Sequence, residues 1–226
     1  MNKTIEEKLE SGRQYRAFAI SADNLETRDD EGNEAMIVKG HATIFNTPYL
    51  LADYGDVKIY EQVDARAFDE ADMSDVIMQY NHEGRVFARN SNGTLRVGSD
   101  EIGLAIVADL GGTTIGRQLY EEIKGGYTNK MSFGFTVAAD ERKESMHKTE
   151  EGLEIYEILR TITKIGKLYD VSAVSIPAND ATDISARAYC EGVYAEAAEE
   201  LRTAQEAARR RQDNINKIKI IAEVTK

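Results

Sequence analysis

The stretch MSFGFTV, residues 131–137, alternates with a period of two along its whole length. Large apolar side chains occupy the odd positions, and serine, glycine and threonine occupy the even ones. This pattern predicts a strand with one face against a core and a small, polar face left open. Gly134 leaves room for another backbone to approach the open face. We therefore consider Ser132 a candidate nucleophile with a peptide on the open face, although this stretch alone fits a plain half-buried strand more simply.

The bulk composition narrows the class of protein. With 226 residues, 42% of them hydrophobic, the chain can form one good-sized domain plus an appendage. Its formal net charge of -12 argues against nucleic-acid binding without a local basic patch. No apolar run is long enough to span a membrane, and no apolar signal region opens the sequence, so we expect no membrane partner. A single cysteine, Cys190, excludes an internal disulfide and a multi-thiolate metal site, fits a reducing cytoplasm, and reads as a free structural thiol.

Strand patterns predominate along the chain. We expect seven to nine strands, a central helix over residues 113–124 capped by threonine and ended by Gly125, and a charged loop over residues 140–152. The predicted fold is therefore β-rich α+β: a closed or nearly closed β-barrel surrounded by helices, with a C-terminal helical arm.

Composition also suggests three segments. Residues 1–14 are a polar N-terminal segment, and residues 15–186 form the β-barrel domain. Residues 187–226 are rich in Ala, Glu, Arg and Gln, and their thin apolar stripe predicts an exposed arm or coiled coil rather than core.

A serine hydroxyl needs a neighbouring base to act as a nucleophile at neutral pH, and histidine is the usual one. The chain has three histidines. His82 closes a predicted strand over residues 75–82 and is followed by Glu83 and Gly84, which places it at a sheet rim; the alternative is an ordinary surface histidine. His41 lies in mid-strand and His147 in the charged loop, so both are poorer candidates.

The base needs a third group that fixes its tautomer. Asp170 heads the apolar strand 170–176, where an unpartnered buried carboxylate would be costly. A solvated carboxylate at the strand end is an equally good interpretation. Arg160 could order an oxyanion-binding segment, but an exposed strand arginine is the simpler interpretation. Motifs such as HExxH, CxxC or a phosphate-binding loop are missing from the sequence, so we expect no metal and no cofactor.

Several short blocks occur together in a fixed order, and they resemble the prohead maturation serine proteases of tailed bacteriophages (caudoviruses) over residues 15–186. The blocks are Gly40-His41-Ala42-Thr43-Ile44-Phe45-Asn46, Tyr80-Asn81-His82-Glu83, Gly93-Thr94-Leu95, Gly103-Leu104, Met131-Ser132-Phe133-Gly134-Phe135 and Leu168-Tyr169-Asp170-Val171-Ser172, running on to Pro177-Ala178-Asn179.

The resemblance implies a barrel related to the herpesvirus capsid maturation proteases (assemblins). It implies a serine endopeptidase with Ser132 as nucleophile and His82 as base. Two positions depart from the family pattern: Asp170 stands where glutamate is typical, and Arg66 stands where glycine is expected. Because aspartate is one methylene shorter than glutamate, the backbone at Asp170 has to lie closer to His82 for the carboxylate to reach it. The herpesvirus relatives use a second histidine, which leaves His41 or His147 as a remote third member.

The resemblance also implies where the protein acts and on what. The enzyme would work inside the phage prohead in the host cytoplasm, encoded by a phage or an integrated prophage. Its substrates would be the scaffold and the scaffolding segment of the major capsid protein, and also itself. We expect a homo-oligomer, a dimer or higher. Two alternatives remain: a non-enzymatic capsid-assembly module with a barrel head and a helical docking arm, and a hydrolase of non-peptide esters or amides.

Overall fold

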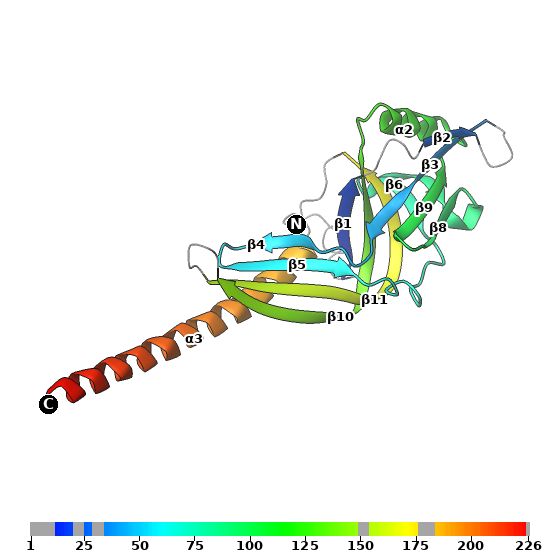
Figure 1. The fold of residues 1–226 in the computed structure, drawn as a ribbon. Coiled ribbons are helices and arrows are strands. Elements are labelled where there is room, and N and C mark those ends of the chain that lie inside the picture. Colours follow the sequence, from blue (N-terminus) through cyan, green and yellow to red (C-terminus); the bar gives the residue numbers. More distant parts are fainter. Residues whose placement is uncertain (1–11, 20–24, 29–33, 149–153, 176–183, 225–226) are drawn as a thin grey trace.

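The computed structural model describes residues 12–19, 25–28, 34–148, 154–175 and 184–224. Within them the fold is β-rich α+β, as predicted, with eleven strands rather than seven to nine (Figure 1). The strands are β1 (Gln14–Ala19), β2 (Leu25–Arg28), β3 (Glu34–Ile44), β4 (Tyr49–Asp53), β5 (Val57–Val63), β6 (Ile77–Tyr80), β7 (Glu83–Arg89), β8 (Leu95–Ser99), β9 (Gly103–Asp109), β10 (Lys130–Lys148) and β11 (Glu154–Val174). The helices are η2 (Asn90–Asn92), α2 (Thr114–Lys124) and α3 (Ile184–Val224).

The larger sheet is organised around the long hairpin of β10 and β11. In the order β1-β10-β11-β5-β4, the neighbours of β10 are both antiparallel, whereas β11 and β5 are parallel. The opposite end of β11 pairs in parallel with β6, and β7 pairs with β6. Thus one strand, β11, connects two separate groups of strands.

The second sheet has the order β2-β3-β9-β8. The main hydrophobic core takes buried side chains from both sheets and from α2. A single bridge between Phe45 and Val63 links the end of β3 to β5. The closure of these strands into a barrel stays a prediction.

Helix α2 forms where its capping residues predict it. Thr113 is the N-cap, and its side-chain oxygen accepts a hydrogen bond from the backbone N–H of Gly116 at 3.0 Å. Leu119, Tyr120 and Ile123 form its buried face, and Gly125 follows as the C-cap. The helix therefore lies against the core just before the chain enters β10.

Helix α3 departs from the prediction of an arm outside the core. Ala186, Cys190, Val193, Ala197 and Leu201 are buried in a second hydrophobic cluster with β4, β5 and β11. The Cys190 side chain is buried in this cluster, as expected of a structural cysteine. These residues recur every three or four positions, so a stripe made largely of small side chains still packs against a sheet.

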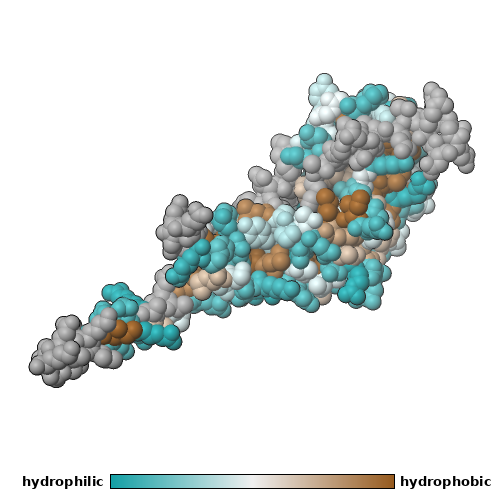
Figure 2. All heavy atoms as spheres, in the orientation of Figure 1, coloured by the Kyte–Doolittle hydropathy of each residue, from teal (hydrophilic) through white to brown (hydrophobic). Residues whose placement is uncertain are grey.

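Beyond Leu201 the helix continues away from the body (Figure 1). The side chains described over residues 209–217 are exposed, including Ile215 at 46%. In Figure 2 the coloured residues of this projecting part are mostly hydrophilic, with one hydrophobic patch among them, and the body shows both kinds. No helix in the described part of the chain has the length and apolar character needed to cross a membrane.

The prediction of a charged loop over residues 140–152 is wrong for residues 140–148, which form a strand. Strand β10 runs on to Lys148, and its charged end stays paired with β11 from Asp140↔Ile162 to Lys148↔Glu154. Residues 149–152 lie outside the described residues. We call the paired ends of β10 and β11, residues 140–148 and 154–162, the exposed ribbon. Its β10 side chains are exposed on both faces, so the sequence shows no hydrophobic alternation there, although the backbone still pairs.

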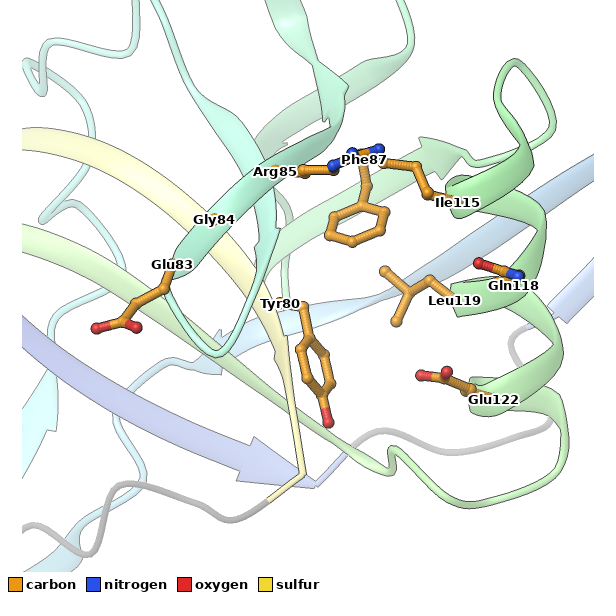
Figure 3. Close-up of a pocket in the computed structure, with 9 residues that line it drawn as sticks. All are labelled: Tyr80, Glu83, Gly84, Arg85, Phe87, Ile115, Gln118, Leu119 and Glu122. Carbon is orange, nitrogen blue, oxygen red and sulfur yellow. The ribbon is translucent and has the colours of Figure 1, made fainter.

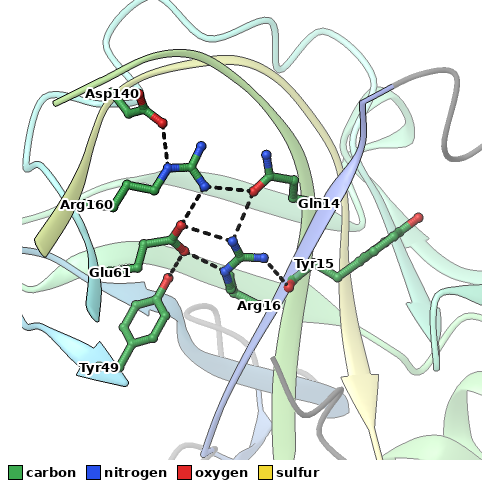
Figure 4. Close-up of polar contacts among 7 residues, drawn as sticks. All are labelled: Gln14, Tyr15, Arg16, Tyr49, Glu61, Asp140 and Arg160. Carbon is green, nitrogen blue, oxygen red and sulfur yellow. Dashed lines mark hydrogen bonds and ion pairs between the residues drawn. The ribbon is translucent and has the colours of Figure 1, made fainter. Parts of the chain in front are cut away.

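A buried charge cluster ties β1 to the centre of the large sheet (Figure 4). The Glu61 carboxylate on β5 accepts hydrogen bonds from Arg16 at 2.5 and 3.0 Å and from Arg160 at 2.9 Å. The Tyr49 hydroxyl also donates to it at 2.5 Å. Burial alone would raise the pKa of Glu61, but the charges and hydrogen bonds of Arg16 and Arg160, with the Tyr49 hydrogen bond, hold that pKa below its ordinary value.

Glu61→Gln should lower the free energy of unfolding by about 3–5 kcal/mol, because it removes the buried carboxylate that pairs with Arg16 and leaves Arg160 only its ion pair with Asp140. Urea denaturation measures this change. Glu70→Gln is the matched control, since Glu70 pairs with Lys164 on the surface and its loss should change stability little. Equal stability of the two variants would contradict the assigned role of the cluster.

The effect of Glu61→Gln should also depend on pH. A carboxyl with a lowered pKa stabilises the folded state above its unfolded value of 4.5, and this contribution is lost as the pH falls through the folded pKa. The stability difference between wild type and variant should therefore be full at neutral pH and shrink below about pH 4.5.

Candidate active site

Strand register brings the predicted site residues to one place. Ser132 lies opposite Ser172 in the β10–β11 ladder, and Gly134 lies opposite Asp170. Because side chains alternate between the faces of a sheet, Ser132 and Asp170 project from the same face. The large apolar side chains of β10, including Phe133, point into the core on the other face.

His82 lies in the tight turn of the β6–β7 hairpin, and not at the end of a strand as predicted. Strand β6 ends at Tyr80, which pairs with Glu83 across the turn. The two central residues, Asn81 and His82, have φ values of 51° and 58°. Such a pair of left-handed residues is typical of the type I′ hairpin turn, and asparagine adopts this conformation more readily than most residues.

The turn is fixed to the end of β11 by its asparagine. The Asn81 backbone N–H donates to the Ala173 carbonyl at 3.0 Å, and the Asn81 side-chain oxygen accepts from the Ser175 N–H at 3.2 Å. Because β6 also pairs with β11 through Ala173↔Tyr80, the imidazole is positioned from the same strand that holds Asp170.

The three side chains form a continuous hydrogen-bonded chain. His82 Nε2 lies 2.6 Å from Ser132 Oγ, and His82 Nδ1 lies 2.5 Å from Asp170 Oδ1. A carboxylate accepts only, so the ring proton belongs on Nδ1 and Nε2 accepts from the hydroxyl. The structure thus brings together all three predicted residues in an arrangement able to draw a proton from serine.

Gly134 explains how a short aspartate reaches the imidazole. A Cβ on Gly134 would lie 2.3 Å from Asp170 Oδ2 and 2.8 Å from the Tyr15 ring. The missing side chain therefore leaves space for the carboxylate and the ring, where the sequence suggested an approaching peptide backbone. Ser172 donates from Oγ to Asp170 Oδ1 at 2.6 Å and helps to hold the carboxylate.

The site is covered by its own surroundings. Ser132 is 0% exposed, Asp170 is 2% exposed, and the His82 side chain is 11% exposed. Strand β1 pairs with β10 so that Ala17 is opposite Ser132, and the Tyr15 ring packs on the imidazole with centroids 4.2 Å apart. Burial lowers the effective dielectric constant around these side chains and so strengthens the electrostatic interactions among them.

The other titratable candidates lie elsewhere. His41 pairs with Asp100 at 2.7 Å on β3, and backbone hydrogen bonds from Gly103 together with His41 lower the pKa of Asp100 to about 2. His147 lies 3.8 Å from Glu157 on the exposed ribbon. Neither histidine takes part in the arrangement around Ser132.

Arg160 is buried, although the sequence analysis favoured an exposed arginine on a strand. It is 3% exposed and bonds to Glu61 and to Asp140. Its guanidinium is therefore held inside the large sheet's buried cluster.

Among the described residues no group of three or more His, Cys, Asp or Glu side chains is placed to hold a metal ion.

Sequence reasoning missed four residues that shape the site: Tyr15, Asn81, Gly134 as the space for Asp170, and Ser172. Ser172 and Asn81 stood inside the motif blocks, where their spacing from Asp170 and His82 was a usable signal. Nothing local marks Tyr15, because its contact depends on the pairing of β1 with β10.

Comparisons with known proteins place this arrangement in context. The family model described as caudovirus prohead serine protease matches residues 23–194. Among solved structures, the capsid assembly protease of bacteriophage T4 is similar, with 12% sequence identity and a TM-score of 0.40. That match covers 72% of this chain and 96% of the other. No curated protein matches.

Gly134→Ala should slow the reaction of Ser132 with a fluorophosphonate probe on the order of 100-fold, because a displaced Asp170 no longer orients the imidazole. Peptide mapping after labelling measures this rate. Gly98→Ala on β8 is the matched control, since a Cβ there meets nothing within 4 Å. A folded Gly134→Ala variant that labels at the wild-type rate would contradict this account of the glycine.

Proposed function

We propose, from the premise that this chain belongs to the caudovirus prohead serine protease family, that Ser132, His82 and Asp170 are the catalytic residues of a capsid maturation endopeptidase. Family membership makes the chain a capsid maturation serine protease that acts inside the phage prohead in the host cell. The observation that most supports the residue assignment is the hydrogen-bonded chain, 2.6 Å from Ser132 to His82 and 2.5 Å from His82 to Asp170.

In the first half of the reaction, Ser132 Oγ attacks the carbonyl carbon of the scissile peptide bond. Its proton moves to His82 Nε2, and the carbonyl oxygen takes the negative charge of the tetrahedral intermediate. As the C–N bond breaks, the imidazolium returns the proton to the leaving amine. The carboxylate of Asp170 stabilises the imidazolium and keeps the ring oriented.

In the second half, water attacks the acyl ester on Ser132 and gives a proton to His82 Nε2. Collapse of the second tetrahedral intermediate breaks the ester bond and returns the proton to Ser132 Oγ. The new carboxylate end of the peptide then leaves, and the starting arrangement is restored.

Access to the hydroxyl requires an opening step. A scissile carbonyl has to come within about 3–3.5 Å of Oγ before it can react. Ser132 has no exposed surface, so we infer that peptide binding moves the groups above it, the Tyr15 ring and the His82 turn. This step separates a resting chain from one engaged with substrate.

The substrates that we propose are the scaffold and the scaffolding segment of the major capsid protein, with cleavage of the chain's own polypeptide as well. The homo-oligomer and the nearly closed barrel also remain proposals. For the part of α3 beyond Leu201, we propose a docking role inside the prohead, which is supported by its projection from the body (Figure 1).

Ser132→Ala and His82→Ala should each reduce cleavage of co-expressed capsid protein by roughly ten-thousand-fold or more, because each removes a group that bonds to the reacting atoms. Asp170→Ala should cost less, since it acts through the imidazole. His41→Ala is the matched control and should cleave normally. Gel analysis of the capsid protein measures the outcome, and wild-type cleavage by folded Ser132→Ala would refute the assignment.

Truncation of α3 should separate docking from chemistry. A chain ending at residue 202 keeps the buried helix residues, so it should retain its stability and its cleavage of a soluble peptide but enter proheads poorly. A chain ending at Cys190 loses buried Val193 and Leu201 and should be less stable by about 3–6 kcal/mol. Thermal melting, peptide cleavage and the protease content of purified proheads measure the three effects. Normal packaging of the longer truncation would contradict the docking role.

A further inference from the structure

A groove of about 380 Å³ lies between helix α2 and the β6–β7 hairpin. Its apolar surface comes from both elements, and Figure 3 shows Tyr80, Phe87 and Leu119 turned toward one another. Leu119 is buried, whereas Tyr80 and Phe87 are half-buried. The groove therefore offers an aromatic and aliphatic surface that a side chain from outside can cover.

The groove adjoins the candidate active site through both of its walls. Tyr80 and Glu83 line it, and they directly flank the turn that holds His82. On the other side, α2 ends at Lys124, and the chain then enters β10 at Lys130, two residues before Ser132. The groove therefore lies beside the His82 turn, on the side of the hairpin where Tyr80 and Phe87 pack toward the core. A peptide that leaves Ser132 toward the start of β10 reaches it by passing round this turn.

Charged side chains at the groove are available to a ligand. Glu83, Arg85 and Glu122 are exposed lining residues. Within the described residues, none of these three side chains forms a hydrogen bond or an ion pair. In Figure 3, Arg85 lies at the Ile115 end, and Glu122 projects from α2 near Tyr80 at the other end.

The opposite side of α2 provides a contrast. A hollow of similar size, about 360 Å³, includes Arg117, Glu121 and Lys124 in its lining. There Glu121 lies 3.9 Å from Lys124, and Arg117 donates to the Gly111 carbonyl at 2.7 Å. The charges of that hollow are engaged within the protein, whereas those of the groove beside His82 are not.

We propose that the groove is a specificity subsite for the peptide substrate, which receives a large apolar side chain with a lysine or arginine within about two residues of it. The apolar side chain covers Tyr80, Phe87 and Leu119. The basic side chain meets the Glu122 carboxylate at the Tyr80 end of the groove. The lining carries two carboxylates, Glu83 and Glu122, and one guanidinium, Arg85, so its net charge favours a basic ligand. This inference rests on the proposed endopeptidase function and adds the class of sequence that it selects.

The test uses the full chain and a mixture of randomised peptides, with cleaved bonds identified by mass spectrometry. Wild type should enrich a large apolar residue together with Lys or Arg on one side of the cleaved bond. Glu122→Lys should lower kcat/KM for a selected Lys-containing peptide by about 5- to 10-fold, mainly through KM, and should favour its Lys→Glu counterpart. Glu121→Lys makes the same charge change on the other side of α2 and should leave the profile unchanged.

The outcomes separate the two proposals. An active Glu122→Lys variant with the wild-type profile would overturn the groove as a subsite and leave the endopeptidase assignment standing. A shift of equal size in Glu121→Lys would also overturn it, because the effect would then follow net charge rather than the groove. A folded wild-type chain that cleaves no peptide in the mixture would overturn both proposals.

Discussion

The pairing of β11 with β10 on one side and with β6 on the other is the constraint on which the candidate site depends. Antiparallel register sets Ser132 opposite Ser172 and Gly134 opposite Asp170, while parallel register sets Asp170 opposite Ile77. Because side chains alternate with a period of two, a slip of one residue in either ladder would send Asp170 or Ser132 to the opposite face. The hydrophobic residues that alternate with them fix the register, since the same slip would expose Phe133 and Val171. Core burial and site geometry are therefore set by one alignment of three strands.

The buried cluster around Glu61 extends this constraint to the N-terminal strand. Glu61 is bonded to Arg16 of β1 and Arg160 of β11, and the cluster involves strands that contribute to the two hydrophobic clusters. Apolar side chains of similar volume would fill such a place at a similar or lower free energy, so the cluster is weak evidence for added stability. Because hydrogen bonds are directional, the Arg16–Glu61 contacts form with β1 in only one position relative to the sheet. That position matters because β1 carries Tyr15, which packs on the His82 ring.

The sequence predicted the parts that depend on local patterns. The alternation at residues 131–137 identified the strand of Ser132, and the threonine and glycine at the ends of α2 identified that helix. The positions of His82 and Asp170 at the ends of predicted strands, together with the family motifs, pointed to these two residues, whose roles stay proposals. The charged end of β10 was missed because two exposed faces carry no hydrophobic period, and β7 was missed because its first four residues are exposed without alternation. The contact of Tyr15 with His82 joins residues 67 positions apart, so only the folded register could supply it.

Placing His82 in a turn rather than in a strand has a consequence for access to the site. Two consecutive left-handed residues other than glycine cost about 1–2 kcal/mol each. The bonds from Asn81 to Ala173 and Ser175 and from His82 to Asp170 offset that cost only while the turn is seated. Lifting the turn would break these few bonds and release strain, whereas lifting β1 would break a ladder and uncover the Arg16–Glu61 pair. Movement of the histidine turn therefore uncovers the buried hydroxyl at lower cost than displacement of the strand beside it, and the turn has to return to its seat before His82 can take the Ser132 proton.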